Sequence, residues 1–425
     1  MEFMRVFTNP KRCMQRLGFL KPLVWHASQS ATNDLSTLGK ELIASVSQKA
    51  SVILTPQIQE YIRSALTDAI YKNIRISGSK HSEETLDKPK VQIELQDFYL
   101  SNADLPSRRG KLINDDWNKY PYLALNLGLL RKGTYSLLVR GHSFLSLVSD
   151  DEKKAFVRSG IALFNGRAAN PFQLTVWQRL LLLFSFIEGD GDVLNSLYQK
   201  ILAGPESLGD REAGAHLPEI YRAVVKAYRD RVRSGDDLLR IQRLLDTADK
   251  IERWTKIKPT GSKDILIQSI TPRLEPFVDL GILSKPDPFA YRYQVTSTTR
   301  AFFEPLINAE STDYFLHNSF FKYASKAFNL NAEHRVNRQT ILPAIERAYM
   351  ILKSPLGYVP ILEVCLLAGI YSIAESGCYF EISEATVMLK TIQKEKPELV
   401  RFNVDRWGKL TFVKFNGDIT TTIGG

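Results

Sequence analysis

The sequence has few cysteines and no long apolar run. Its 425 residues include only three cysteines (Cys13, Cys365 and Cys378), which give no disulfide framework and fit a reducing cytoplasm. The most apolar stretch, residues 180–187, is interrupted by Ser185 and is too short to span a bilayer. The first residues are basic and mixed, without the continuous apolar core of a secretory signal. We therefore expect a cytoplasmic protein with no membrane partner.

Motifs for catalysis and for cofactors are also missing. The sequence has neither a P-loop nor a Gly-x-Ser-x-Gly elbow. The cysteines and the six histidines are scattered, so their spacing does not indicate zinc. Glu94 lies on a predicted strand and Asp97 follows it three residues later, but the nearby lysine expected of a metal-dependent nuclease is missing. We expect no enzyme activity, no cofactor and no bound metal, with any catalysis supplied by another protein subunit.

The composition is that of a folded protein with an excess of basic residues. Hydrophobic residues make up 44% of the chain and charged residues 24%, which is typical of globular domains. The length allows two to four domains. A net charge of +10 favours a polyanionic partner, most simply nucleic acid, although a generally basic surface would give the same number.

One stretch, residues 269–306, gives the clearest structural pattern. Thr271 can cap a helix and Pro272 suits its first position, so we expect a helix over 272–280. Gly281 ends this helix because glycine adopts the left-handed conformation at little cost. Residues 291–295 alternate as a half-buried strand does, and a further helix begins at 297. Helix, glycine stop, hairpin and helix form the second half of a winged-helix module.

The same order recurs twice. Residues 127–130 (LGLL) match residues 280–283 (LGIL), and a tight turn and a predicted strand over 135–139 follow them. A weaker copy near the C-terminus has a predicted helix over 384–396 and a hairpin over 399–402 and 410–415. No repeat of fixed period is present, so a solenoid is not expected.

The resulting fold class is mainly α with small β-hairpins (α+β), built of winged-helix modules joined by helical segments. The expected divisions are a basic N-terminal arm (1–33), module 1 (34–148), a helical linker segment (149–214), module 2 (215–310) and a helical segment with module 3 (311–425). Module 1 should begin with helices over 34–51 and from 55, then a strand over 91–99. Module 2 should begin with amphipathic helices over 217–230 and 236–257, whose charged residues, Arg240 among them, lie largely on a solvated face. In the last segment, Gly377 should end a long apolar helix over 358–374. In the linker segment we expect a buried helix that breaks at 188–192, where Asp192 caps the next helix, and an irregular stretch over 203–214. Aromatic residues in 311–331 suit a helix that packs on a core, or exposed rings for base stacking.

Basic and polar residues near the predicted hairpins are the candidate DNA contacts. In a winged helix-turn-helix, the helix before the hairpin enters the major groove and the hairpin touches phosphate or the minor groove. The candidates in module 2 are Gln268, Ser269, Arg273, Lys285, Arg292 and Arg300; in module 1, Arg108, Arg109, Lys111, Arg131, Lys132 and Arg140; and in module 3, Lys390, Lys394, Arg406 and Lys409.

The stretch from Tyr120-Pro121-Tyr122 through residues 127–130 and the following hairpin resembles the tandem winged-helix recognition regions of type IIS restriction endonucleases. Residues 280–283 and the hairpin after them resemble the same class. The resemblance implies duplex DNA recognition in restriction or antiviral defence, although the chain lacks a visible cleavage domain. The architecture is also similar to kleisin-type subunits, whose terminal winged helices bind partner subunits.

Two functions follow as hypotheses. The first is a double-stranded DNA-binding recognition or adaptor subunit of a DNA-processing or anti-phage defence complex. The alternative is a non-catalytic, kleisin-like interaction subunit whose winged helices bind protein partners. Salt dependence separates them, because binding through several phosphates weakens steeply with salt.

Overall fold

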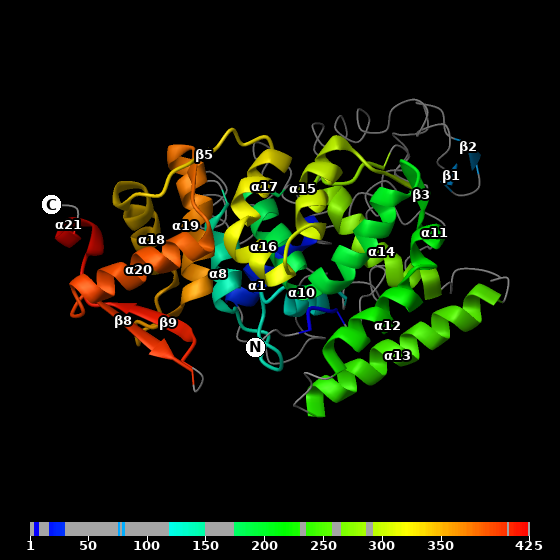
Figure 1. The fold of residues 1–425 in the computed structure, drawn as a ribbon, viewed down its shortest axis with the longest axis horizontal. Coiled ribbons are helices and arrows are strands. Elements are labelled where there is room, and N and C mark those ends of the chain that lie inside the picture. The colour runs from blue at the N-terminus through cyan, green and yellow to red at the C-terminus, as the bar shows by residue number, and fades with distance from the viewer. Residues whose placement is uncertain are drawn as a thin grey trace.

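The computed structural model describes residues 4–7, 17–29, 75–76, 79–80, 119–148, 174–229, 235–256, 265–285, 292–405 and 408–423. Within these ranges helices dominate and the strands form small sheets of two or three strands, which confirms the mainly helical class with small β elements (Figure 1). The helices expected over 34–51 and from 55, and the strand expected over 91–99, lie outside the described residues. No helix in the described ranges is both long and apolar enough to cross a membrane.

Helix α10 (Val176–Ala203) lies in the middle of the molecule (Figure 1). Thr175 begins it with a capping box, and residues 180–187 are all buried. The break expected at 188–192 is wrong, because α10 continues through it. Its two glycines are needed for close packing: a Cβ on Gly189 would lie 2.3 Å from the ring of Phe7, and one on Gly191 would lie 2.5 Å from Thr312.

The N-terminal residues that the structure describes pack into the core. Val6 and Phe7 are buried beside α10, and Leu23 and Val24 of α1 (Leu20–Gln29) are fully buried. The short 3-10 helix η1 (Leu17–Phe19) precedes α1, and the backbone N–H of Leu17 donates to the Asp279 carboxylate at 2.7 Å. Apolar residues spaced among the basic ones supply these contacts.

The two matching glycine steps have the same backbone geometry. Gly128 follows α7 (Lys119–Asn126) with φ of 70°, and Gly281 follows α14 (Ile265–Asp279) with φ of 75°. After Gly128, two successive N–H groups donate to the carbonyl of Ala124, and after Gly281, two donate to the carbonyl of Phe277. The predicted helix stops are confirmed, although α14 begins earlier than expected and includes both Thr271 and Pro272.

The hairpin expected in module 1 is wrong. Leu130 and Leu137 form a single antiparallel bridge, and α8 (Val139–Ser146) begins at the last residue of the expected strand. Tyr135 has a φ of 52°, which interrupts extended backbone. Gly141 allows α8 to pack closely on the preceding turn, because a Cβ at this position would lie 2.3 Å from the carbonyl oxygen of Leu129.

In module 2 the expected strand is confirmed, but its partner comes from elsewhere. Strand β4 (Arg292–Gln294) buries Tyr293 and pairs antiparallel with β3 (Ser207–Gly209), while Ser284 bridges to Gln294. The irregular stretch expected over 203–214 therefore contains β3 and the short helix α11 (Asp210–Gly214), which packs against α14. Only long-range pairing identifies β3, whose sequence, Ser-Leu-Gly, is weakly β-forming.

Helices make up most of the remaining structure. Helices α12 (Leu217–Tyr228) and α13 (Gly235–Lys256) pack on each other, as their amphipathic sequences predicted. Helix α15 (Ser297–Ile307) follows β4 with Thr296 as its cap. The aromatic segment forms two helices, α16 (Thr312–Asn318) and α17 (Phe320–Ala327), and its rings Phe315, Phe320 and Phe321 are buried, which favours the core role over base stacking.

In the C-terminal part, helices alternate with short strands. In chain order it contains β5 (Glu333–His334), α18 (Arg338–Leu352), β6 (Val359–Pro360), α19 (Ile361–Ser376), β7 (Cys378–Tyr379), α20 (Ile382–Glu395), β8 (Val400–Val404), β9 (Leu410–Phe415) and α21 (Ile419–Ile423). Strand β9 is central in the antiparallel sheet β6-β9-β8. The hairpin and Gly377, which ends α19 with φ of 63°, were both expected. Two short β-strands of two residues each, β1 (Arg75–Ile76) and β2 (Ser79–Lys80), pair near the start of the chain.

We predict that Gly369→Ala destabilises the contact between α17 and α19. A Cβ on Gly369 would lie 2.3 Å from the ring of Phe321, which is buried and cannot move without repacking. Overpacking of this kind costs about 1–3 kcal/mol of unfolding free energy, to be measured by urea denaturation. Gly235→Ala is the matched control, since nothing lies within 4 Å of its Cβ position. Equal stability of the two variants would contradict the prediction.

Candidate nucleic-acid interface

Module 2 does not present its helix to solvent. Arg273 on α14 is 1% exposed, and its guanidinium donates to Asp190 at 2.6 and 3.0 Å, to the Tyr221 hydroxyl and to the Ser269 and Phe7 carbonyls. All five N–H donors are therefore satisfied inside the protein. Burial alone would lower the pKa of Arg273, but the Asp190 carboxylate raises it above its ordinary value, so the arginine stays charged.

This arrangement corrects the expectation that Arg273 reads a groove. Ser269 is buried beside it, and Gln268 lies on α14 outside the residues whose side chains are described. Lys285 is held by Glu275 at 2.5 Å with both side chains nearly buried, so it is not available to a duplex either. Arg292 and Arg300 remain at the surface, where Arg292 donates to Ser207 at 2.9 Å and Arg300 to Glu304 at 3.4 Å.

The basic residues of module 1, like those of module 2, include both buried and exposed side chains. Arg140 is buried and donates to Glu188 of α10 and Glu363 of α19, so it connects three helices and is not a DNA contact. Arg131 and Lys132 are exposed in the turn after α7. Arg108, Arg109 and Lys111 lie outside the described residues.

Module 3 carries the basic residues that remain open. Lys390 and Lys394 are exposed on α20, one helical turn apart, and Lys409 is exposed between β8 and β9. Arg406 lies outside the described residues. Among the residues that are described, no ion pair holds any of these three lysines. We define them as the α20 lysine group.

Buried Glu381 fixes the start of α20. Its carboxylate accepts the backbone N–H groups of Phe321 at 3.1 Å and Lys322 at 2.9 Å, at the first turn of α17. Burial raises the pKa of Glu381 to about 7, even though those two hydrogen bonds act to lower it. With Glu384 completing the capping box, this contact orients α20 relative to the helical body.

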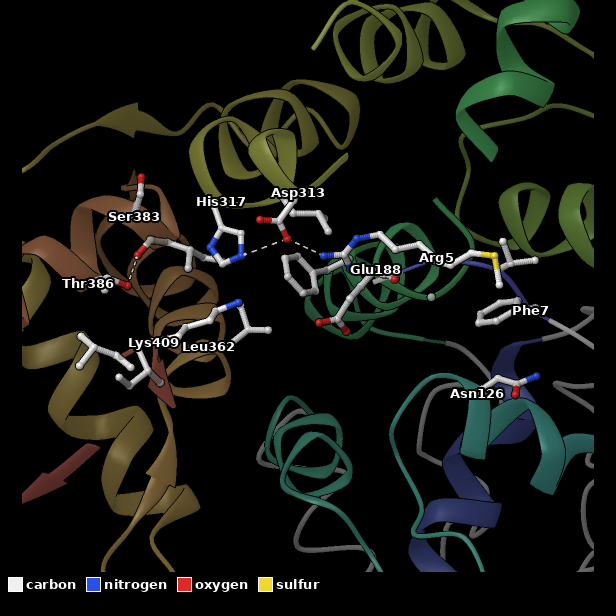
Figure 2. Close-up of a pocket in the computed structure, with 18 of the residues that line it drawn as sticks. Arg5, Phe7, Asn126, Glu188, Asp313, His317, Leu362, Ser383, Thr386 and Lys409 are labelled. Carbon is white, nitrogen blue, oxygen red and sulfur yellow. Dashed lines mark hydrogen bonds and ion pairs between the residues drawn. The ribbon is translucent and has the colours of Figure 1, made fainter. Parts of the chain in front are cut away.

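A cleft of about 950 Å³ lies between α20 and the helical body, and its lining includes Lys390 and Lys409. Figure 2 shows Arg5 and His317 on either side of the Asp313 carboxylate, at 2.6 and 3.9 Å. Burial lowers the pKa of His317, while Asp313 opposes this and Lys409 adds to it. A cation and an imidazole thus share one carboxylate, and the two lysines leave the cleft positive.

Sequence reasoning missed the residues that complete this cleft. Arg5 was expected on the basic N-terminal arm, and Arg240 of α13 on a solvated helix face. In the structure Arg240 donates to the carbonyl of Val6 at 3.2 Å. His317 was hidden among aromatic core residues of α16. These residues are far apart in the sequence, so no local pattern connects them. The structure brings Lys390 and Lys409 to one cleft, with Lys394 one helical turn further along α20, but leaves Arg131, Arg292 and Arg300 on separate elements.

Comparison with known proteins gives no match among family models, curated proteins or solved structures. The function is therefore inferred from the chain itself.

Proposed function

We propose that this chain binds double-stranded DNA through a winged-helix module formed by α18, β6, α19, α20, β8 and β9. The observation that carries the proposal is the α20 lysine group, which lies on the last helix before a hairpin and on the turn of that hairpin. In winged helices the last helix approaches the major groove while the hairpin approaches the backbone. Strand β6 between the first two helices pairs with the second hairpin strand, which supports the same assignment.

Charge and surface chemistry favour nucleic acid as the ligand. The exposed side of α20 carries Thr391 between Lys390 and Lys394, and no acidic residue interrupts it between residues 385 and 394. Lysines without protein partners attract phosphate and release counterions when they bind it. We infer a recognition or adaptor subunit, with catalysis supplied by another protein subunit.

The proposal predicts that Lys390, Lys394 and Lys409 contribute to duplex affinity mainly through phosphates. In the triple Ala variant, the slope of log affinity against log salt should become less steep by about 3, roughly one unit for each lost contact. Fluorescence anisotropy with a labelled random-sequence duplex, across 50–200 mM salt, measures both affinity and slope.

The matched control removes the same charge elsewhere. Lys200, Lys226 and Lys250 are exposed on α10, α12 and α13, and their triple Ala variant should bind the duplex almost as the unchanged protein does. If both triple variants lose equal affinity, the protein binds through its general basic charge only. If the unchanged protein does not bind duplex at low salt, the proposal is excluded.

Exposed apolar side chains on the same module favour a second candidate, a kleisin-like interaction subunit. Leu356, Val387 and Val404 are 78%, 60% and 58% exposed. Exposed apolar side chains that gather on one surface mark protein interaction sites, and these three belong to the same module. A partner bound through them would be retained at 500 mM salt in a pull-down and lost in a Val387→Ser, Val404→Ser variant.

A further inference from the structure

The sheet β6-β9-β8 has an outer face with an unusual set of side chains. In the antiparallel register Asn403 lies opposite Phe412, and Arg401 lies opposite Lys414. Alternate residues of a strand share a face, so these four form one two-by-two patch. Val413, which lies between Phe412 and Lys414 in the chain, is fully buried on the inner face, which packs toward α19 and α20. We call the four residues the outer-sheet patch.

The patch places two positive charges directly opposite each other. Like charges at opposed positions of an antiparallel pair are destabilising. Within the described part of the chain, no ion pair neutralises either Arg401 or Lys414. The Lys414 ammonium instead lies 5.4 Å from the centre of the Tyr358 ring, over its face. An anion between the two cations would remove their repulsion, so the patch is complementary to a phosphate.

The other half of the patch offers a flat apolar surface. Phe412 is 40% exposed although it lies on the central strand of the sheet. Because β6 and β8 occupy both edges of β9, a ligand at Phe412 must bind the ring and not the backbone. Asn403, directly opposite, supplies donors and an acceptor for a base edge.

An exposed ring flanked by cations is the arrangement that binds single-stranded nucleic acid, because every base has a face that can stack. A duplex does not fit this chemistry, since its bases are already stacked on one another. An acidic peptide could neutralise the two cations with carboxylates, but it does not repeat a flat ring and an anion along one strand as a nucleic acid does. We propose that the outer-sheet patch binds single-stranded nucleic acid, with a base on Phe412 and a phosphate between Arg401 and Lys414.

This site differs from the proposed duplex site. The α20 lysine group lies on a helix and a turn, whereas the outer-sheet patch faces away from α20 on the other side of the sheet. In Figure 1 the hairpin of β8 and β9 lies below α20, toward the left end of the molecule. Either site can therefore be present without the other.

The test uses the full chain and two labelled probes, a twelve-nucleotide thymidine oligomer and its uridine equivalent, in fluorescence anisotropy. Phe412→Ala should weaken binding of the preferred oligomer roughly tenfold to a hundredfold, the loss expected for one stacked base. Phe412→Tyr keeps a ring and should restore affinity to within about twofold. The two probes distinguish DNA from RNA, and either one binding in this way supports the site.

Controls separate stacking from charge and from folding. Tyr314→Ala removes an exposed ring on α16 and should leave oligomer binding unchanged. The Arg401→Glu, Lys414→Glu variant keeps Phe412 and should abolish oligomer binding, which gives a second measure if Phe412→Ala lowers the melting temperature. Duplex affinity should be unchanged in Phe412→Ala, so the two sites fail separately. Unchanged oligomer binding in Phe412→Ala, equal loss in Tyr314→Ala, or no oligomer binding by the unchanged protein at low salt would overturn the proposal.

Discussion

Arg273→Ala should lower the free energy of unfolding by about 3–5 kcal/mol, because it leaves the Asp190 carboxylate buried without its partner. Asp190 and Arg273 are each about 1% exposed, and Asp190 also accepts the Phe7 backbone N–H at 2.8 Å. The pair thus holds together α10, α14 and the N-terminal segment. Urea denaturation followed by tryptophan fluorescence measures the loss.

Two further variants make this result specific. Arg300→Ala removes an exposed arginine of α15 that forms an ion pair with Glu304 of the same helix at 3.4 Å, and should cost less than about 1 kcal/mol. The double variant Asp190→Asn, Arg273→Met removes both charges and should regain part of the stability lost in Arg273→Ala. If Arg273→Ala unfolds at the same urea concentration as Arg300→Ala, the buried pair does not stabilise the fold.

Arg140→Ala should lower the free energy of unfolding by a similar amount, about 3–5 kcal/mol, because the Arg140 guanidinium pairs with two carboxylates on different helices. Glu188 belongs to α10 and Glu363 to α19, so the cluster joins α8 and the C-terminal helices to the centre of the molecule. Limited proteolysis of Arg140→Ala should release the C-terminal part faster than in the unchanged protein. Denaturation in urea gives the loss of stability.

The pH dependence of stability distinguishes this ionic cluster from simple packing. Burial would raise the pKa of Glu188, but Arg140 lowers it below its ordinary value. The contribution of Glu188 is therefore present above its unfolded pKa and lost as pH falls through the lower folded pKa. Without Arg140 the buried carboxyl group should have a raised pKa, so Arg140→Ala should gain stability as pH falls from 7 toward 5. The same pH profile in both proteins would contradict this role.

Local pattern predicted many of the elements correctly. The glycine stops at Gly128, Gly281 and Gly377 were predictable because a helix end in the left-handed conformation favours glycine. Helices α12 and α13 follow from apolar residues at helical spacing, and the β8–β9 hairpin from alternation around a turn. The errors lie where distant contacts override local preference, as at Gly189 against Phe7 and at β3 beside β4.

The basic residues of the candidate site show the same contrast between local pattern and distant contacts. Sequence alone identified Lys390, Lys394 and Lys409 among sixteen candidates, but gave them no priority over Arg273 or Arg140. A basic residue near a predicted helix or hairpin has the same local signature whether it faces water or a buried acid. Asp190 pairs with Arg273 and Glu188 pairs with Arg140, which keeps both arginines inside the protein. These acids lie 83 and 48 residues away in the chain.

The sequence by itself determined the basic charge, the helical class and most helix ends, because these depend on composition and on neighbours within a few residues. The tertiary structure decided which cations are paired inside the protein and which remain at the surface. That choice depends on the free energy of burying a charge, which is favourable only where a carboxylate and hydrogen-bond acceptors are already in place. The same long-range packing turned Phe412, Arg401 and Lys414 outward on a sheet whose other face is core.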